Sequence, residues 1–160
     1  MALRTVTMLS VSLAIVALDQ WSKSLVRQHF LGRGGEPIPL LGGVVQINYV
    51  ENRGAAFGLF QNQTTFFVLV GLVVVVAILL SYRHLPRGSP LLYLCLGLQL
   101  GGAVGNLIDR VRFGHVVDFI DLRFWPVFNV ADSAITVGVA ALIYQLLLAS
   151  PRAGAEDRAS

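Results

Sequence analysis

The sequence predicts an all-α polytopic membrane protein with four transmembrane helices and a small β-sheet outside the membrane. Of its 160 residues, 55% are hydrophobic and only 13% are charged, and the mean hydropathy is +0.70, far more apolar than an ordinary soluble domain. Four segments reach or approach the roughly 20 residues needed to cross a bilayer. These candidate spans are about residues 5–25, 64–82, 90–108 and 129–149.

The first apolar segment begins just after Arg4 and resembles a secretory signal peptide. It runs into Asp19-Gln20-Trp21-Ser22-Lys23, which contains no small-residue cleavage site, so we expect an uncleaved helix. Asp19 and Lys23 lie four residues apart and therefore share one face of this helix. Their charges can neutralise each other near the membrane surface.

Residues 30–62 connect the first two spans and change in character along their length. Glycine and proline between residues 32 and 39 indicate turns, and the β-branched and aromatic run 44–50 predicts a strand. The small residues Gly54, Ala55 and Ala56 let the backbone come close to a neighbouring helix or an extended ligand. A tight turn before the second span explains them equally well.

The second span, 64–82, is almost uniformly apolar, and we interpret it as scaffold. The short basic loop 83–89 predicts that the second and third spans are antiparallel neighbours. Cys95, in the middle of the third span, is the only cysteine and is expected to pack in the core. Lys and Arg are distributed over both sides of the predicted topology, so their count does not decide its orientation.

The third span carries a face without side chains that ends in a polar cluster. Its glycines recur every four residues at Gly97, Gly101 and Gly105, which predicts close packing against another helix. The same helix then presents three polar side chains at helical spacing, namely Asn106, Asp109 and Arg110.

Two aspartates flank the entrance to the fourth span. Asp118 lies in the connection before it, and Asp132 lies in its first turn with Asn129 as the expected N-cap. Residues 119–131 are long enough for the connection to fold back and bring the two acids together. A carboxylate at the edge of hydrocarbon is costly to ionise, so its presence indicates chemistry, transport or a structural ion pair.

If Asp118 and Asp132 converge on one water, they can hold a single proton between them. One carboxylate then removes a proton from water while the protonated partner polarises a carbonyl, as in aspartic proteases. This chemistry needs no metal and no cofactor. The histidines His29, His84 and His115 show no ligand spacing, and the scattered Lys and Arg residues indicate no nucleic-acid site.

Two other functions compete with hydrolysis at this point. A small ion- or proton-coupled transporter would use Asp19, Asp118 and Asp132 to bind or relay a cation. It leaves unexplained why these acids gather toward one membrane face, and four spans without repeats make a thin transport path. A non-enzymatic assembly factor would use the glycine face for partner helices, but it leaves the paired acids without a role.

Five segments in order resemble the motifs of the lipoprotein signal peptidase family, also called signal peptidase II. The resemblance covers most of the chain, and five ordered motifs in a four-span protein of this length are a highly specific signal. The matching segments are Asp19–Lys23, Asn52–Phe57, Gly101–Arg110, Val116–Phe119 and Phe128–Asp132.

This resemblance implies an aspartic endopeptidase that removes signal peptides from diacylglyceryl-modified prolipoproteins, cutting before the lipid-modified cysteine. Asp118 and Asp132 match the family's catalytic pair, and the family is blocked by the cyclic peptide globomycin. By motif position, the residues that line or support the substrate site are Asn52, Gly54, Asn106, Arg110, Asn129 and Ala131. Asp19 and Lys23 would stabilise the structure nearby.

The resemblance also implies where the protein lies. It places a four-span domain, residues 1–150, in the bacterial inner membrane, with both termini in the cytoplasm and the active site at the periplasmic face. The small sheet becomes an extracytoplasmic cradle for substrate within residues 30–62, and residues 151–160 become a polar cytoplasmic tail. The expected partners are lipid-modified prolipoproteins and membrane lipids, and we expect a monomer.

Overall fold

The computed structural model describes residues 2–54, 60, 62–82 and 90–149. Our expectations for Ala55 and Ala56, the basic loop 83–89 and the tail 151–160 lie outside the described residues. Within the described ranges the chain forms four α-helices, three strands and one short 3-10 helix. Their bounds are α1 Ala2–Arg33, β1 Ile38–Leu40, η1 Leu41–Gly43, β2 Val45–Asn52, α2 Thr64–Ser81, α3 Pro90–Phe113, β3 Val116–Asp121 and α4 Val130–Ala149.

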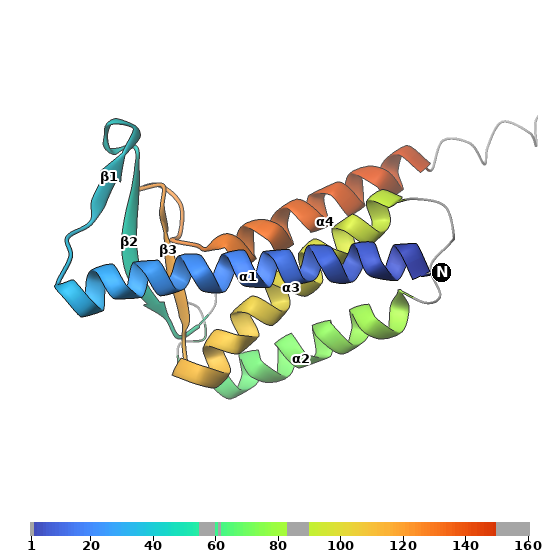
Figure 1. The fold of residues 1–160 in the computed structure, drawn as a ribbon, viewed down its shortest axis with the longest axis horizontal. Helices are drawn as coiled ribbons and strands as arrows, with labels where there is room; N and C mark the ends of the chain where they lie inside the picture. The colour runs from blue at the N-terminus through green and yellow to red at the C-terminus, as the bar shows by residue number, and fades with distance from the viewer. Residues whose placement is uncertain (1, 55–59, 61, 83–89, 150–160) are drawn as a thin grey trace, which may run out of the picture.

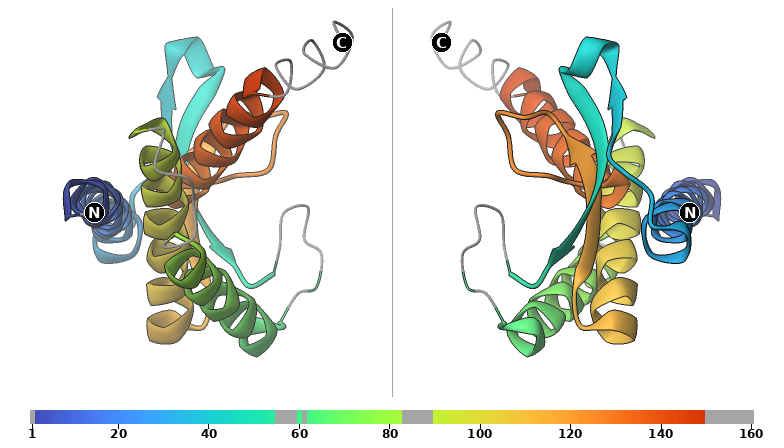
Figure 2. Two further views of the ribbon diagram at one scale, coloured as in Figure 1. Left: turned by 90° about the vertical axis from the view of Figure 1, so that its right-hand side faces the viewer. Right: turned by 90° about the vertical axis from the view of Figure 1, so that its left-hand side faces the viewer.

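Helix α3 is the centre of the helical bundle. It packs against α1, α2 and α4, which surround it in the end-on views of Figure 2. A core of large side chains from α1, α2 and α3 joins these helices, formed by Met8, Ile78, Tyr93, Leu96 and Leu100. Cys95 is fully buried, which confirms its predicted place in the core.

The glycine face of α3 packs against α1. A Cβ atom added at Gly97 would lie 2.7 Å from the backbone oxygen of Met8, and one at Gly101 would lie 2.7 Å from that of Ser12. These distances are too short for any side chain, so the two helix backbones approach each other only because the glycines lack one. The predicted close packing is therefore confirmed, and its partner is the first helix.

Three helices of the described chain are long and apolar enough to cross a membrane, at Leu3–Gly32, Thr64–Ser81 and Pro90–Phe113. The apolar part of α4, Val130–Gln145, is shorter. Successive helices alternate in direction, so the start of α1 and the end of α4 both lie at the end of the bundle away from the sheet (Figure 1). This arrangement supports four spans, although the fourth stays a prediction.

Helix α1 continues well beyond the predicted end of its span near residue 25. Its last turns pack against the sheet, where the rings of Phe30 and Tyr49 stack with centroids 6.3 Å apart. Because this contact lies between two elements distant in sequence, membrane-length hydropathy could not predict it. Helix α3 likewise extends past residue 108 to Phe113.

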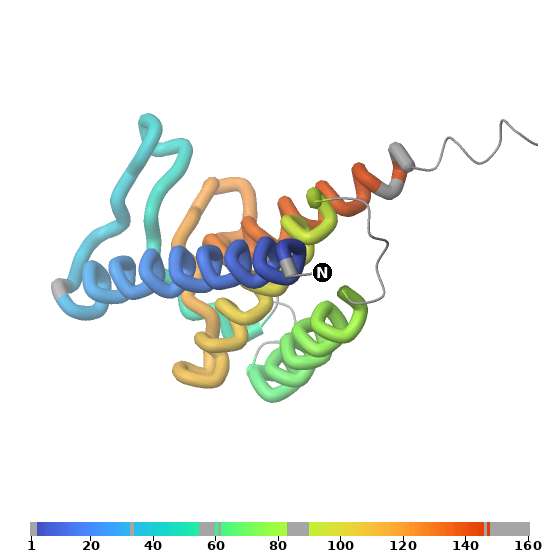
Figure 3. The backbone as a smooth tube through the Cα atoms, turned by 45° about the vertical axis from the view of Figure 1, so that its right-hand side comes forward, coloured from blue at the N-terminus to red at the C-terminus, as the bar shows by residue number. Residues whose placement is uncertain are grey.

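The three strands form one antiparallel sheet in the order β1-β2-β3 at one end of the bundle (Figure 1). The predicted strand 44–50 is β2, which continues to Asn52, and its hairpin with β1 projects from the molecule (Figure 3). The third strand, β3, was predicted only as a connection. It pairs with β2 so that Val50 lies opposite Asp118 and Asn52 opposite Val116.

Candidate active site

The structure places Asp118 in the middle of β3, where its side chain is only 1% exposed. Both of its carboxylate oxygens accept a hydrogen bond from an asparagine. Nδ2 of Asn52, at the end of the neighbouring strand, lies 2.8 Å from Oδ2, and Nδ2 of Asn129 lies 2.7 Å from Oδ1. Strand pairing and the start of α4 therefore fix this carboxylate from two sides.

Asp132 lies in the first turn of α4 and forms a reciprocal cap with Asn129. The backbone N–H of Asp132 donates to Oδ1 of Asn129 at 2.9 Å, and the backbone N–H of Asn129 donates to Oδ2 of Asp132 at 3.3 Å. This is the capping-box arrangement, in which two side chains satisfy the free N–H groups at a helix start. It confirms Asn129 as the N-cap and orients the Asp132 carboxylate.

Two buried asparagines connect the aspartates to each other and to α3. Asn129 contacts Asp118 through its side-chain amide and Asp132 through its cap. Asn106 donates from Nδ2 to Oδ1 of Asp132 at 2.8 Å, and its own Oδ1 lies 3.1 Å from Nδ2 of Asn129. The two carboxylates thus belong to one hydrogen-bonded cluster.

The connection between β3 and α4 folds back on itself, as the predicted meeting of the aspartates requires. Ile120 and Phe128 exchange backbone hydrogen bonds of 2.8 and 3.1 Å, which closes the loop between them. Arg123 ties this loop to β2, because its Nη1 donates to Oε1 of Gln46 at 2.7 Å. The closed loop delivers the chain to Asn129, next to the strand that carries Asp118.

Behind the asparagines lies a buried ionic cluster formed by Asp19, Lys23 and Asp109. Nζ of Lys23 is 2.8 Å from Oδ2 of Asp19 and 2.9 Å from Oδ2 of Asp109, and all three side chains are at most 3% exposed. Lys23 also donates to Oδ1 of Asn106 at 3.1 Å. The predicted pairing of Asp19 with Lys23 is confirmed, but Lys23 has a second acidic partner from α3.

Each carboxylate of the ionic cluster also holds the backbone next to one of the two aspartates. Oδ1 of Asp19 accepts from the N–H of Ala131 at 3.0 Å, and Oδ2 of Asp109 accepts from the N–H of Val117 at 3.0 Å. Ala131 immediately precedes Asp132, and Val117 immediately precedes Asp118. Lys23 therefore links the supports of both aspartates.

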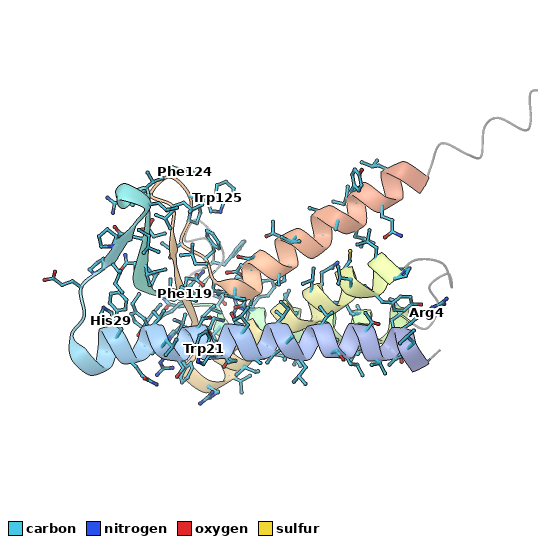
Figure 4. The ribbon with its side chains drawn as sticks, turned by 45° about the horizontal axis from the view of Figure 1, so that its top comes forward. Arg4, Trp21, His29, Phe119, Phe124 and Trp125 are labelled. Atoms are coloured by element: carbon cyan, nitrogen blue, oxygen red, sulfur yellow. The ribbon has the colours of Figure 1, made fainter. Side chains whose placement is uncertain are left out.

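A cavity of about 640 Å³ opens beside the two aspartates. Asn52, Gly54 and Arg110 line it together with both carboxylates, and Nη2 of Arg110 lies 3.5 Å from the backbone oxygen of Gly54. The rest of the lining is mostly apolar and comes from α4 and the β3–α4 loop. Figure 4 shows Phe124 and Trp125 of this loop at the sheet end of the molecule.

Burial raises the pKa of the Asp118 carboxyl from 3.8 to about 7, and the charge of Asp132 acts in the same direction. The amide donors Asn52 and Asn129 and the ammonium of Lys23 limit this rise. Asp118 consequently exchanges its proton near neutral pH, as a general acid or base requires.

All ten residues singled out from the sequence lie in this one region. They line the cavity or belong to the supporting cluster, by which we mean the ionic cluster together with Asn106, Asn129 and Ala131. Gln20 and Asp109 were given no role, although both occur in the matching segments. Nε2 of Gln20 donates to Oδ1 of Asp109 at 2.9 Å, so both belong to the support. Besides its place in the segment Gly101–Arg110, the sequence signal for Asp109 was its helical spacing from Asn106. The apolar loop residues Leu122 and 124–127, which also line the cavity, gave no such signal.

Solved structures and curated proteins resemble this chain over nearly its whole length. Two solved bacterial membrane enzymes match with TM-scores of 0.81 and 0.76 at 27% and 30% identity, covering 94% and 88% of this chain and 93% and 92% of theirs. The lipoprotein signal peptidase of Moorella thermoacetica is 52% identical over 148 residues, which are 92% of this chain and 97% of the relative. That of Halothermothrix orenii is 47% identical over 85% of this chain and 92% of its own.

The family model for signal peptidase II matches residues 11–148. This range includes most of α1, all of α2 and α3, nearly all of α4, and both aspartates of the cavity. With the apolar helices and the likeness to membrane enzymes, it identifies an integral membrane peptidase. The chain belongs to the signal peptidase II family.

Proposed function

We propose that this protein is an aspartic endopeptidase that removes the signal peptide from diacylglyceryl-modified prolipoproteins, with Asp118 and Asp132 as its catalytic pair. One observation carries the proposal. The two carboxylates line the same cavity, are joined through Asn129, and include one whose pKa is about 7. Such a pair holds one proton over the neutral pH range.

The reaction follows from this shared proton. The ionised carboxylate takes a proton from a water molecule, whose oxygen attacks the carbonyl carbon of the scissile peptide bond. The protonated carboxyl donates to the carbonyl oxygen, which gives a neutral tetrahedral diol. When the diol collapses, its proton passes through the pair to the leaving nitrogen, the C–N bond breaks, and the pair returns to its starting state.

The surrounding residues support this chemistry in different ways. Asn52, Asn106 and Asn129 orient the carboxylates, while Gly54 and Arg110 line the cavity where the substrate backbone would lie. Asp19, Lys23 and the backbone of Ala131 belong to the supporting cluster and position the pair without touching substrate. No step requires a metal or a cofactor.

The shape of the cavity suits a substrate that is half lipid. Val137 of α4 lines the cavity and is 58% exposed, so the cavity opens along a surface that faces hydrocarbon in a membrane-spanning α4. The apolar lining can accept acyl chains and a signal helix directly from the bilayer, while the polar wall holds the peptide. We place this site at the periplasmic face of the inner membrane, with both termini cytoplasmic and the sheet as an extracytoplasmic cradle.

A cleavage assay in proteoliposomes tests the proposal. The substrate is one prolipoprotein prepared with and without the diacylglyceryl group on its cysteine. We expect the wild type to cleave the modified form and to be blocked by globomycin, and Asp118→Asn and Asp132→Asn each to lose cleavage while retaining helical circular dichroism. Asp121→Asn, in the same strand as Asp118 but outside the cavity lining, is the matched control and should cleave normally.

The outcomes separate the parts of the proposal. Full cleavage by Asp118→Asn or Asp132→Asn would reject the catalytic pair. Equal cleavage of both substrate forms would reject lipid dependence and leave the peptidase activity standing. The transporter alternative predicts no cleavage by any form of the protein, and the membership of the peptidase family speaks against it.

A further inference from the structure

A second cavity, of about 400 Å³, lies between α1 and the end of α3 near the sheet. We call it the arginine cavity, because Arg27 of α1 and Arg112 of α3 line it together with Lys23 and Phe113. Among the described residues, it shares no lining residue with the cavity of the two aspartates. It is therefore a separate site, and neither arginine has a role in the proposed reaction.

The two arginines converge on one aromatic ring and lack acidic partners. The guanidinium carbon of Arg27 lies 3.7 Å from the centroid of the Phe113 ring, and that of Arg112 lies 5.1 Å from it. Neither forms an ion pair within the described part of the chain. Moreover, Nη1 of Arg27 is buried and has no hydrogen-bond partner among the described residues. A buried donor left unpaired is unfavourable, so a ligand that accepts from it would be stabilised.

The net charge around the arginine cavity determines the sign of the charge on that ligand. Asp109 and Lys23 also line the cavity and with Asp19 carry a net charge of −1, but their polar atoms are engaged with one another and with Gln20. The two arginines add +2, so the site as a whole is positive by one charge. This charge favours an anion between the guanidinium groups and away from Asp109. Phosphate suits this position, because guanidinium groups bind its oxygens through paired hydrogen bonds.

The position of the arginine cavity indicates where the phosphate comes from. Arg27 and Arg112 lie near the ends of two apolar helices, and the ends of a helix that spans a bilayer lie at the level of the lipid headgroups. On α1, Trp21 and Leu25 are 62% and 47% exposed, which provides apolar surface for acyl chains next to the cavity. Such a position brings the two guanidinium groups within reach of the phosphates of lipid headgroups.

We propose that the arginine cavity binds the phosphate of an anionic membrane phospholipid, with Arg27 and Arg112 as the ligating side chains. The lipid would lie along α1 on a different surface from the peptidase cavity. The proposal does not depend on the catalytic role of the two aspartates.

Thermal unfolding of the full-length protein in detergent micelles tests this site. The probes are dihexanoyl phosphatidylglycerol, dihexanoyl phosphatidylcholine and inorganic phosphate, each titrated separately. We expect phosphatidylglycerol to raise the midpoint of thermal unfolding until the site is saturated. Phosphatidylcholine and inorganic phosphate should raise it clearly less. Arg112→Gln should lower the affinity for phosphatidylglycerol about tenfold, and adding Arg27→Gln should lower that affinity by about another factor of ten.

Two variants keep the result interpretable. Arg112 is exposed, so Arg112→Gln should fold even if the double variant does not. Arg123→Gln, which removes a similar charge from the β3–α4 loop, should respond to phosphatidylglycerol like the wild type. An unchanged response in Arg112→Gln, or no response in the wild type, would overturn the site. An equal response to inorganic phosphate would overturn the lipid as its source.

Discussion

The buried carboxyl of Asp118 should make this protein less stable as the pH rises, and Asp118→Asn should remove that dependence. The pKa of this carboxyl is 3.8 in the unfolded chain and about 7 in the folded protein. Below the lower value the carboxyl is protonated whether the chain is folded or not. Between the two values only the folded state holds the proton, so the free energy of unfolding falls with rising pH until Asp118 ionises in the fold as well.

The magnitude follows from the two pKa values. One pKa unit corresponds to about 1.4 kcal/mol, so ionised Asp118 lowers the free energy of unfolding by about 4 kcal/mol above neutral pH. Asparagine avoids this cost but loses one of the two amide donors, from Asn52 or Asn129, at about 1–3 kcal/mol. Asp118→Asn should therefore be more stable than the wild type by about 1–3 kcal/mol at pH 8. That advantage should disappear at pH 4.

Thermal unfolding in detergent micelles, followed by far-UV circular dichroism between pH 4 and 8, measures this difference. For a chain of this size 1 kcal/mol corresponds to roughly 2–4 °C, so the two midpoints should move relative to each other by about 10 °C over this range. Asp121→Asn changes a partly exposed carboxylate of the same strand and should follow the wild type. If the difference between the unfolding midpoints of Asp118→Asn and the wild type is the same at every pH, the reasoning is refuted.

Three further predictions concern the reaction and its support. Because the pair must keep one proton, kcat/KM for a lipid-modified peptide should fall as the pH rises above about 7, and a flat profile from pH 6 to 9 would contradict this. Lys23→Met leaves Asp19 and Asp109 buried without their cation, so the free energy of unfolding should fall by about 3–5 kcal/mol. Adding Asp19→Asn should recover part of this loss of stability. Gly105→Ala would put a Cβ atom 2.6 Å from Oδ2 of Asp19 and should lower the free energy of unfolding by about 1–3 kcal/mol together with the cleavage rate. Gly71→Ala, whose Cβ atom would meet Leu107 at an ordinary 3.5 Å, should change neither thermal stability nor cleavage.

The helices could be predicted from the sequence because their signal is local. The nearly uniform apolar stretch 64–82 is long enough to identify a membrane span, and the spacing of Gly97, Gly101 and Gly105 identifies a face that packs closely. The third strand, β3, has no comparable local signal. Its run Val116-Val117 is β-branched, but only the pairing with β2 makes it a strand, and a single sequence contains no record of that pairing.

The candidate site was harder to predict than the helices, because the ion pairs and hydrogen bonds that support it join residues far apart in the chain. Spacing predicts that Lys23 can reach Asp19 one helical turn away, but not that it reaches Asp109 on another helix. That second contact gives the cluster its function. Asp19 accepts from the N–H of Ala131 and Asp109 accepts from the N–H of Val117, so a single ammonium fixes the residue before each aspartate of the proposed pair. Neutralising Lys23 should therefore disturb both aspartates together, whereas Asn52→Ala, which removes a donor to Asp118 alone, should leave the cap around Asp132 intact.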